Sequence, residues 1–300
     1  MRRRARKHQS ERRTLWRKSS SDLPRYRRAL LFRLHQPIGK LFAEAPAPPN
    51  VTAKAVYCFD VEARAAVLAK NCRFRMPPAS TVKLATALVL LRVTKGDLSA
   101  CVEIQEGDCT IGSSMGLVEG DRLTHLDLLH GLLLSSGNDA AQAIARTVGR
   151  ILLEEDGQLG DPIARFVLAM NELAIELGLT RTRFMNPSGL DVQGLYSTAK
   201  DIALLGAKAF SDPVIRAVSQ KTTYSAEIFG NKPRRIDLTT TVTILGEHGV
   251  LCGKTGTTST AGSCLVLYSF ASGRPFVTVL LASNSEKGRY DDARSILIEL

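Results

Sequence analysis

Residues 77–88 read PPASTVKLATAL, and the rest of the chain is organised around this stretch. Its two prolines end an extended segment, because the residue before a proline avoids the helical region of backbone space. The apolar residues that follow predict a buried helix that runs to about Val93 and stops at Gly96. Ser80 and Lys83 are three positions apart, so they share one face of that helix and their side-chain ends can meet. A serine hydroxyl is a weak nucleophile until a base takes its proton, and a lysine on the same face can be that base.

Lys83 can act as a base only where burial or a second cation lowers its pKa. A Ser-x-x-Lys pair is common by chance, but two further stretches strengthen the argument. Residues 134–141 read LSSGNDAA and contain Ser136-Gly137-Asn138, and residues 252–262 read CGKTGTTSTAG and contain Lys254-Thr255-Gly256. The three short motifs occur in this order along the chain, which predicts an active site assembled from three separate segments.

The net charge of +11 is concentrated at the N-terminal end of the chain. Residues 1–40 hold 14 lysines and arginines against two acids, so this segment carries +12 and the remainder is near neutral, at −1. The charge therefore predicts weak contact of a tail with anionic membrane or polymer. It predicts no specific nucleic-acid partner, because the rest of the chain contains no recognisable nucleic-acid-binding module. We expect residues 1–28 to be disordered and residues 45–50, APAPPN, to form a stiff linker.

The route of export is not evident from the N-terminal residues. The chain begins with positive charges, but the apolar run ALLF at residues 29–32 is stopped by Arg33, so a secretory signal peptide is incomplete. No stretch approaches the roughly 18 apolar residues of a membrane-spanning helix. We expect a basic tail and linker over residues 1–50 and one domain over residues 51–300.

The order of expected elements favours one mixed domain. Strands over residues 51–60 and 63–68 come first, and strands over residues 252–258, 264–271 and 274–283 precede a closing helix over residues 290–300. Helices over residues 126–134, 140–148, 162–177 and 197–206 fill the middle, with extended segments at 102–104, 222–228 and 239–245. This pattern predicts an α/β (α+β sandwich) fold. Its mainly antiparallel sheet is built from both chain ends, is flanked by helices and carries an inserted all-helical subdomain.

The three motifs resemble those of the serine-type D-alanyl-D-alanine carboxypeptidases, the low-molecular-mass penicillin-binding proteins. The resemblance extends to FMNPSGL at residues 184–190, to STAKD at residues 197–201 and to Ala261-Gly262, so it covers about residues 51–300. It implies a β-lactamase/transpeptidase-like fold and removal of the terminal D-alanine from peptidoglycan stem peptides. It also implies a periplasmic or otherwise extracytoplasmic location and no cofactor. Many members of the family continue past the closing helix into a β-rich domain and a membrane-binding end, whereas this sequence stops there.

The resemblance implies catalytic roles for three residues. Ser80 would attack the carbonyl between the last two D-alanines and form an acyl-enzyme, and Lys83 would be the base for that step. Ser136 would relay a proton toward the leaving amine, and water would then hydrolyse the ester. β-Lactams, which mimic the D-Ala-D-Ala end, would acylate Ser80.

The resemblance also implies how the substrate is bound. Asn138 would hydrogen-bond the substrate or position Lys83. Lys254 would supply positive charge for the terminal carboxylate and help keep Lys83 neutral, and Thr255 could bind the same carboxylate. Gly256 would let the substrate lie close to its strand. The backbone amides of Ser80 and Thr257 would form the oxyanion hole.

Simpler interpretations of these residues stay open at this point. Ser136 and Asn138 could be cap and turn residues only, and Lys254 could be a solvated strand lysine. The histidines lack metal-ligand spacing, so we expect no metal site. The six cysteines contain no Cys-x-x-Cys pair; Cys252 and Cys264 could be paired, but buried free thiols are at least as compatible with the sequence.

Other functions are also compatible with parts of the pattern. A class A β-lactamase would need a glutamate in a Glu-x-x-Leu-Asn context, and none of Glu154, Glu155, Glu172 and Glu176 has it. A D,D-endopeptidase has the same motifs, so the motifs do not distinguish it from a carboxypeptidase. An inactive peptidoglycan-binding module would not require the intact trio.

Overall fold

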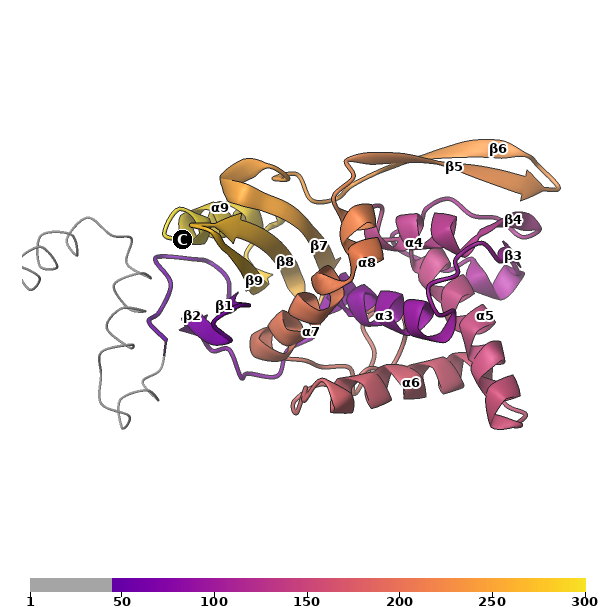
Figure 1. Ribbon diagram of the computed structural model, residues 1–300, viewed down its shortest axis with the longest axis horizontal. Helices are drawn as coiled ribbons and strands as arrows, with labels where there is room; N and C mark the ends of the chain where they lie inside the picture. Colours follow the sequence, from indigo (N-terminus) through magenta and orange to yellow (C-terminus); the bar gives the residue numbers. More distant parts are fainter. Residues whose placement is uncertain (1–44) are drawn as a thin grey trace, which may run out of the picture.

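The computed structural model describes residues 45–300, which form a sheet layer joined to a largely helical half (Figure 1). Residues 1–44 lie outside the described residues, and so does the disorder that we expect over residues 1–28. The linker is described from its first residue, and the carbonyl of Pro46 accepts a hydrogen bond from the backbone N–H of Ala69. Within residues 45–300, no helix has both the length and the apolar character needed to cross a membrane.

The described strands form two antiparallel sheets. The five-stranded sheet has the order β2-β1-β9-β8-β7, so strands from both ends of the chain lie side by side, as the sequence predicts. The four-stranded sheet has the order β3-β4-β5-β6. The bounds are β1 Ala55–Asp60, β2 Ala65–Lys70, β3 Cys101–Glu103, β4 Asp121–Thr124, β5 Thr223–Gly230, β6 Arg234–Thr239, β7 Val250–Thr258, β8 Gly262–Ala271 and β9 Arg274–Ser283.

The helices begin at recognisable caps. The side chains of Thr124 and Asp127 form a capping box at the start of α4, and Asp161 caps α6 ahead of a proline at its first position. The bounds are α3 Lys83–Val93, α4 His125–Leu133, α5 Asn138–Asp156, α6 Pro162–Glu176, α7 Ala199–Ser211, α8 Pro213–Ser219 and α9 Glu286–Leu297, with short 3-10 helices η2 Ala79–Val82, η3 Glu106–Asp108 and η4 Glu247–Gly249.

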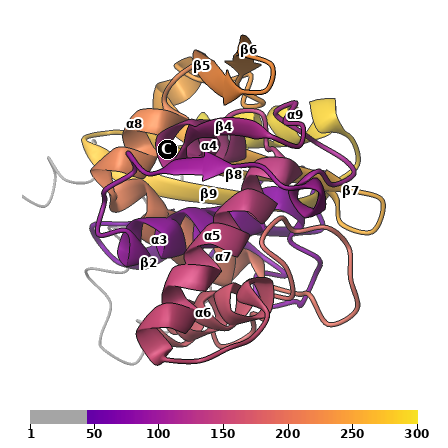
Figure 2. The same ribbon diagram turned by 90° about the vertical axis from the view of Figure 1, so that its right-hand side faces the viewer.

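Alternation along the central strands gives the five-stranded sheet two apolar faces. On β1, Tyr57 and Phe59 pack into the core shared with the helical half, whereas Val56 and Cys58 pack toward the core under α9. Helix α9 contacts β8 and β9 on one face, and α7 contacts β1, β8 and β9 on the other. Figure 2, turned by 90°, shows α6 at one end of the helical half and the β5–β6 hairpin at the other. The sheet is therefore the middle layer of a sandwich, and β7 is its edge strand beside the helical half.

The expectation of an all-helical insertion is wrong, because the helical half carries the four-stranded sheet. Strand β6 ends at Thr239, so the expected strand over residues 239–245 is also misplaced. Residues 234–239 read RRIDLT and face solvent at alternate positions, which left too few apolar residues to mark a strand. The short α8 was missed in the same region. Asp212 caps the start of α8, where its carboxylate accepts hydrogen bonds from two backbone N–H groups. A helix of seven residues is too short to show a clear periodic pattern of apolar residues.

The NPSG loop (residues 186–189) packs directly under the catalytic stretch. A Cβ added to Gly189 would lie 2.0 Å from the carbonyl oxygen of Ala79 and 3.0 Å from the backbone nitrogen of Ser80. Gly189 also has a φ of +84°, which disfavours any side chain. This glycine therefore sets the position of the backbone on which Ser80 stands.

We expect Gly189→Ala to lower the free energy of unfolding by about 2–4 kcal/mol, because it adds a clash with backbone to an unfavourable φ. It should also slow acylation of Ser80 by a penicillin at least about tenfold, since a sub-ångström shift moves the nucleophile. The matched control is Gly178→Ala, which has a φ of +68° and nothing within 4 Å of the added Cβ. It should cost only about 1 kcal/mol. Equal losses in thermal unfolding and acylation for the two variants would contradict this account.

Candidate active site

Ser80 and Lys83 meet at the junction between η2 and α3. Ser80 lies in the 3-10 turn and is half-buried, and Lys83 is the first residue of α3 and is fully buried. Ala79, just before the serine, has a φ of +49°, an unusual backbone angle for a non-glycine residue that the packing around it holds in place. The Nζ atom of Lys83 lies 2.9 Å from Oγ of Ser80, so the pairing expected from their spacing is present in the fold.

The contacts of Lys83 can be satisfied by a neutral amine, as they can by an ammonium group that donates to all three oxygens. Its Nζ lies 2.7 Å from Oδ1 of Asn138 and 2.8 Å from the carbonyl oxygen of Ser188. Both of these oxygens can only accept, so they take two N–H bonds of Lys83. A neutral amine then has one lone pair left, and the third contact is the hydroxyl of Ser80. In this protonation state the serine O–H donates to Nζ, which is the arrangement that activates the nucleophile.

Burial favours that neutral state. Burial lowers the pKa of Lys83 from 10.5 to about 7, and the carboxylate of Asp139 opposes the shift in part. The pKa of Lys254 is also well below its usual range, first because of burial and then because of Lys83 and Arg289. The main cause of the lowered pKa of Lys83 is therefore its removal from water, and not the nearby Lys254 that the sequence suggests.

The Ser136-Gly137-Asn138 turn joins α4 to α5 and faces Lys83. Ser136 has a φ of +61°, and a Cβ on Gly137 would lie 3.1 Å from the backbone nitrogen of Met115, so a larger residue would not fit. The amide group of Asn138 has a fixed orientation: its Nδ2 donates to the carbonyl of Ile111 at 2.8 Å, and its Oδ1 therefore points to Lys83. These contacts go beyond the cap-and-turn interpretation of Ser136 and Asn138.

Asp139 follows the Ser136-Gly137-Asn138 turn and holds a loop in place instead of capping α5. The helix cap position is held by Gly137, and α5 begins at Asn138, so Asp139 does not cap that helix. Its buried carboxylate instead accepts from the hydroxyl of Ser114 and from the backbone N–H groups of Met115, Gly116 and Leu117. Asp139 thereby fixes the loop that covers the Ser136 turn.

Strand β7 forms the third wall of the site. Lys254 is fully buried and donates to Oγ of Ser136 at 2.8 Å and to the carbonyl of Thr255 at 2.8 Å, so the solvated-lysine interpretation is wrong. A Cβ on Gly256 would lie 2.7 Å from the backbone nitrogen of Ser80, which shows how closely the strand approaches the nucleophile. The hydroxyl of Thr255 donates to the hydroxyl of Thr241 at 2.6 Å. The outer edge of β7 is not paired with another described strand.

Arg289, which carries no sequence motif, belongs to the same wall. It comes from α9, is 5% exposed and donates through Nη1 to the hydroxyl of Thr257 at 2.9 Å, while that hydroxyl is also paired with the carboxylate of Glu286. Its Nε is buried and has no hydrogen-bond partner among the described residues. A guanidinium keeps its proton at any physiological pH, so Arg289 is a permanent positive charge beside two lysines whose pKa values are lowered.

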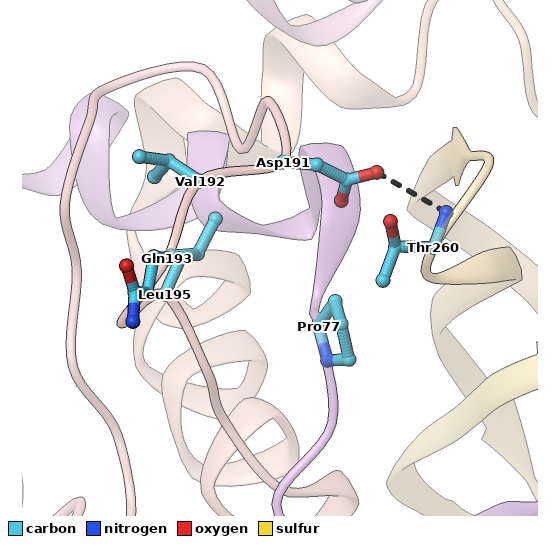
Figure 3. Close-up of a pocket in the computed structure, with 6 residues that line it drawn as sticks. All are labelled: Pro77, Asp191, Val192, Gln193, Leu195 and Thr260. Carbon is cyan, nitrogen blue, oxygen red and sulfur yellow. Dashed lines mark hydrogen bonds between the residues drawn. The ribbon is translucent and has the colours of Figure 1, made fainter.

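A cavity of about 310 Å³ lies between the start of the catalytic stretch and the β7–β8 turn. Figure 3 shows Asp191 reaching across it toward the turn, where the carboxylate accepts from the backbone N–H of Thr260 at 3.1 Å and from the hydroxyl of Thr258 at 2.8 Å. Pro77, three residues before Ser80, lines the opposite side. The cavity is lined by Pro77, Asp191, Val192, Gln193, Leu195 and Thr260.

The comparisons with known proteins agree with this geometry. The model of the family described as D-alanyl-D-alanine carboxypeptidase matches residues 42–285. The chain belongs to this family. Its members are serine peptidases, so the Ser80–Lys83 pair is the candidate for the nucleophile and its base in this chain.

Individual relatives are similar over most of the chain. The D-alanyl-D-alanine carboxypeptidase of Streptomyces sp. strain K15 is 29% identical over 269 residues, covering 87% of this chain and 91% of that protein. The Escherichia coli (strain K12) carboxypeptidase DacC is 29% identical over 83% of this chain, which spans 61% of that relative's length. The solved structure of the Streptomyces K15 DD-transpeptidase has a TM-score of 0.77, 28% identity, and covers 84% of this chain and 98% of that one.

The structure brings together Ser80, Lys83, Ser136, Asn138, Lys254, Thr255, Gly256 and Thr257, all of the residues that the sequence singles out. Two contributors escaped sequence analysis. Asp139 acts through a loop more than 20 residues away in the chain, and Arg289 lies in a helix whose register with β7 is set by tertiary packing alone. All six cysteines, which lie in the described part of the chain, are free thiols, and Cys252 and Cys264 are buried.

The carboxypeptidase should be acylated by a penicillin at a rate that rises with pH through about 7. Lys83 is a base only when neutral, and its pKa is about 7, so each unit of pH below that value should slow acylation about tenfold. The measurement is the second-order rate constant of acylation against pH. A profile that keeps rising to pH 10 without a bend would contradict the lowered pKa.

The Asn138→Asp variant tests the same point with an isosteric change. A carboxylate 2.7 Å from Nζ favours the ammonium form, so the midpoint of the pH profile should rise by about 1–3 units. Asn231→Asp, in the exposed β5–β6 turn, adds the same charge far from Lys83 and should leave the midpoint unchanged. If both variants keep the wild-type midpoint, Lys83 is not the group that titrates.

Proposed function

We propose that this carboxypeptidase removes the terminal D-alanine from peptidoglycan stem peptides outside the cytoplasm, with Ser80 as the nucleophile. The contact that carries the proposal is the Nζ of Lys83, 2.9 Å from the Ser80 hydroxyl and saturated elsewhere by two carbonyl acceptors. Oγ of Ser80 attacks the carbonyl carbon between the two D-alanines as its proton passes to Lys83. The negative charge that develops on the carbonyl oxygen is held by the backbone amides of Ser80 and Thr257.

The leaving group then needs a proton on its nitrogen. Ser136 accepts a hydrogen bond from Lys254, which leaves its own O–H free to donate into the site. The C–N bond breaks as this proton reaches the leaving amine, D-alanine departs, and an ester remains on Ser80. Ser136 is reprotonated, by way of Lys254, with the proton that Lys83 took from Ser80, so Lys83 is neutral again. A water molecule, deprotonated by Lys83, hydrolyses the ester and restores the serine.

The substrate's terminal carboxylate identifies which end of the peptide enters the site. Arg289 is permanently charged, whereas the buried Lys254 has a pKa well below its usual range in the empty site. An arriving carboxylate compensates the burial of Lys254 and raises its pKa, so that Lys254, Arg289 and the hydroxyl of Thr255 share the anion. The peptide then pairs with the free edge of β7, and its acyl side leads into the cavity beside Pro77.

The surroundings of Ser80 favour slow turnover of β-lactams. Of the glutamates that could activate a deacylating water, Glu176 pairs with Arg92 at 2.6 Å and Glu172 lies 3.6 Å from Arg165, both at the surface. The described hydrogen bonds of Lys83 include no carboxylate. A class A β-lactamase is therefore the weaker candidate.

We expect a labelled penicillin to form one stable adduct on the wild-type protein and none on Ser80→Ala. Intact mass recorded over time measures both, and D-alanine release from a pentapeptide then checks the reaction. Clearance of the adduct within seconds would indicate a β-lactamase. No adduct on folded wild-type protein would exclude Ser80 catalysis, and release from cross-linked dimers only would indicate an endopeptidase.

Arg289→Leu should raise KM for a D-Ala-D-Ala peptide about 10–100-fold, since hydrogen bonds to charged groups contribute about 1.5–3 kcal/mol. Arg294→Leu, one turn further along α9 and paired with Glu247, is the matched control and should leave KM unchanged. A peptide that ends in D-alaninamide has no carboxylate, so wild type and Arg289→Leu should hydrolyse it alike. An equal loss on both peptides would place Arg289 in support of the fold instead.

A further inference from the structure

An exposed aromatic side chain surrounded by arginines lies next to the catalytic stretch. Phe74 is 71% exposed, Arg73, Arg75 and Arg181 line the same hollow, and the exposed Arg183 lies two residues after Arg181 in the chain. We call these five residues the Phe74 surface. The segments over residues 72–77 and 180–183 both bond to residues 196–197, through backbone hydrogen bonds between Met76 and Ser197 and between Arg183 and Tyr196.

The positive charge of the Phe74 surface is not compensated. Among the described residues, none of its four arginines forms an ion pair, whereas arginines such as Arg92, Arg146 and Arg234 pair with carboxylates. The carboxylate of Asp201 contacts the segment through the backbone N–H of Arg181, but Asp201 is 4% exposed. It therefore leaves the exposed guanidiniums free to attract an anion.

Neutral groups hold two of these arginines in place. The guanidinium of Arg75 lies over the ring of Tyr196, 4.6 Å from its centroid, and Nη1 of Arg181 donates to the carbonyl of Arg73 at 3.1 Å. Such contacts orient a cation without neutralising it, so the surface is preorganised for a negatively charged ligand. An exposed phenylalanine among them adds an apolar face on which a ligand can pack.

The Phe74 surface extends to Pro77, at the start of the catalytic stretch. A hollow of about 590 Å³ is lined by Arg73, Phe74, Arg75 and Arg181, and a neighbouring one of about 580 Å³ shares Phe74 and Arg75 and reaches Pro77. Pro77 also lines the cavity at the β7–β8 turn. Lys54 and Lys70 line the second hollow and add positive charge, and neither hollow is lined by an acid.

We propose that the Phe74 surface binds the carboxylate-bearing peptidoglycan polymer to which the stem peptide in the active site is attached. This inference rests on the proposed function and extends it to the substrate's polymeric form. When the D-Ala end of a stem peptide occupies the site, the rest of the peptide extends on the acyl side, past Pro77. Its free carboxylates and the chains linked to it then contact the arginines. An anionic lipid surface would attract the same arginines, but one hollow reaches Pro77, three residues before Ser80, which favours the substrate itself.

The test measures binding without turnover. In a Ser80→Ala background, co-sedimentation with insoluble peptidoglycan is compared for the parent, for Arg73→Gln/Arg75→Gln/Arg181→Gln, and for Arg73→Lys/Arg75→Lys/Arg181→Lys. The control is Arg64→Gln/Arg122→Gln/Arg150→Gln, which removes the same charge from exposed positions elsewhere. We call the triple glutamine variant of Arg73, Arg75 and Arg181 the patch variant, and we expect it to bind about 10-fold or more weakly at low salt. The triple lysine variant should retain most binding, and the control should match the parent.

Activity assays separate this inference from the proposed function. With Ser80 present, the patch variant should keep the wild-type rates of penicillin acylation and of D-alanine release from a short peptide, and lose rate only on polymer. Wild-type protein that fails to release D-alanine yet binds polymer through the arginines would overturn the proposed function alone. Equal polymer binding by patch variant and parent, or an equal loss in the control, would overturn the inference.

Two further outcomes identify the ligand chemistry. Peptidoglycan whose carboxylates have been converted to amides should bind the parent protein as weakly as native polymer binds the patch variant. Loss of binding to phosphatidylglycerol vesicles in the patch variant, with polymer binding unchanged, would overturn the assignment in favour of a membrane.

Discussion

One buried amine determines what this molecule can do. Lys83 is surrounded by two carbonyl-type oxygens and one hydroxyl, and this set of partners is satisfied by an amine with two N–H donors and a lone pair. The rest of the site maintains that arrangement. The NPSG loop supplies the carbonyl of Ser188, the Ser136 turn supplies Asn138, and burial makes the ammonium form unfavourable.

The architecture explains how three distant segments meet with such accuracy. The sheet is assembled from both ends of the chain, so β7 lies beside η2 although the two are far apart in sequence. Gly256 and Gly189 allow their backbone segments to approach Ser80 closely. Asp139 ties a third segment down by accepting hydrogen bonds from successive backbone amides. A buried carboxylate with this many donors is well satisfied, so it can hold a loop rigidly over the Asn138 turn.

Sequence reasoning reached the residues whose chemistry is local and missed those whose role is tertiary. The spacing of Ser80 and Lys83 predicts their contact, and the apolar run that follows the turn Ser272-Gly273 predicts β9 at Arg274–Ser283. Nothing local marks Arg289, because its place beside Thr257 depends on how α9 crosses the sheet. Alternate positions of the β5–β6 hairpin face solvent, so few apolar residues mark its strands, and the all-helical insertion was wrong for that reason. The division over residues 1–50 and 51–300 stays a prediction.

The site also separates its charges by environment. Lys83 and Lys254 are buried and have lowered pKa values, whereas Arg289 keeps its charge and the arginines around Phe74 keep theirs in solvent. On our proposal, the neutral Lys83 acts as the base, and the charged arginines attract the anion. The most direct test is an NMR titration of protein labelled at lysine Cε, with Lys83 assigned by its absence from Lys83→Met. The account predicts a Lys83 signal with a midpoint near 7. A Lys83 signal that titrates near 10.5, like an exposed lysine, would contradict it.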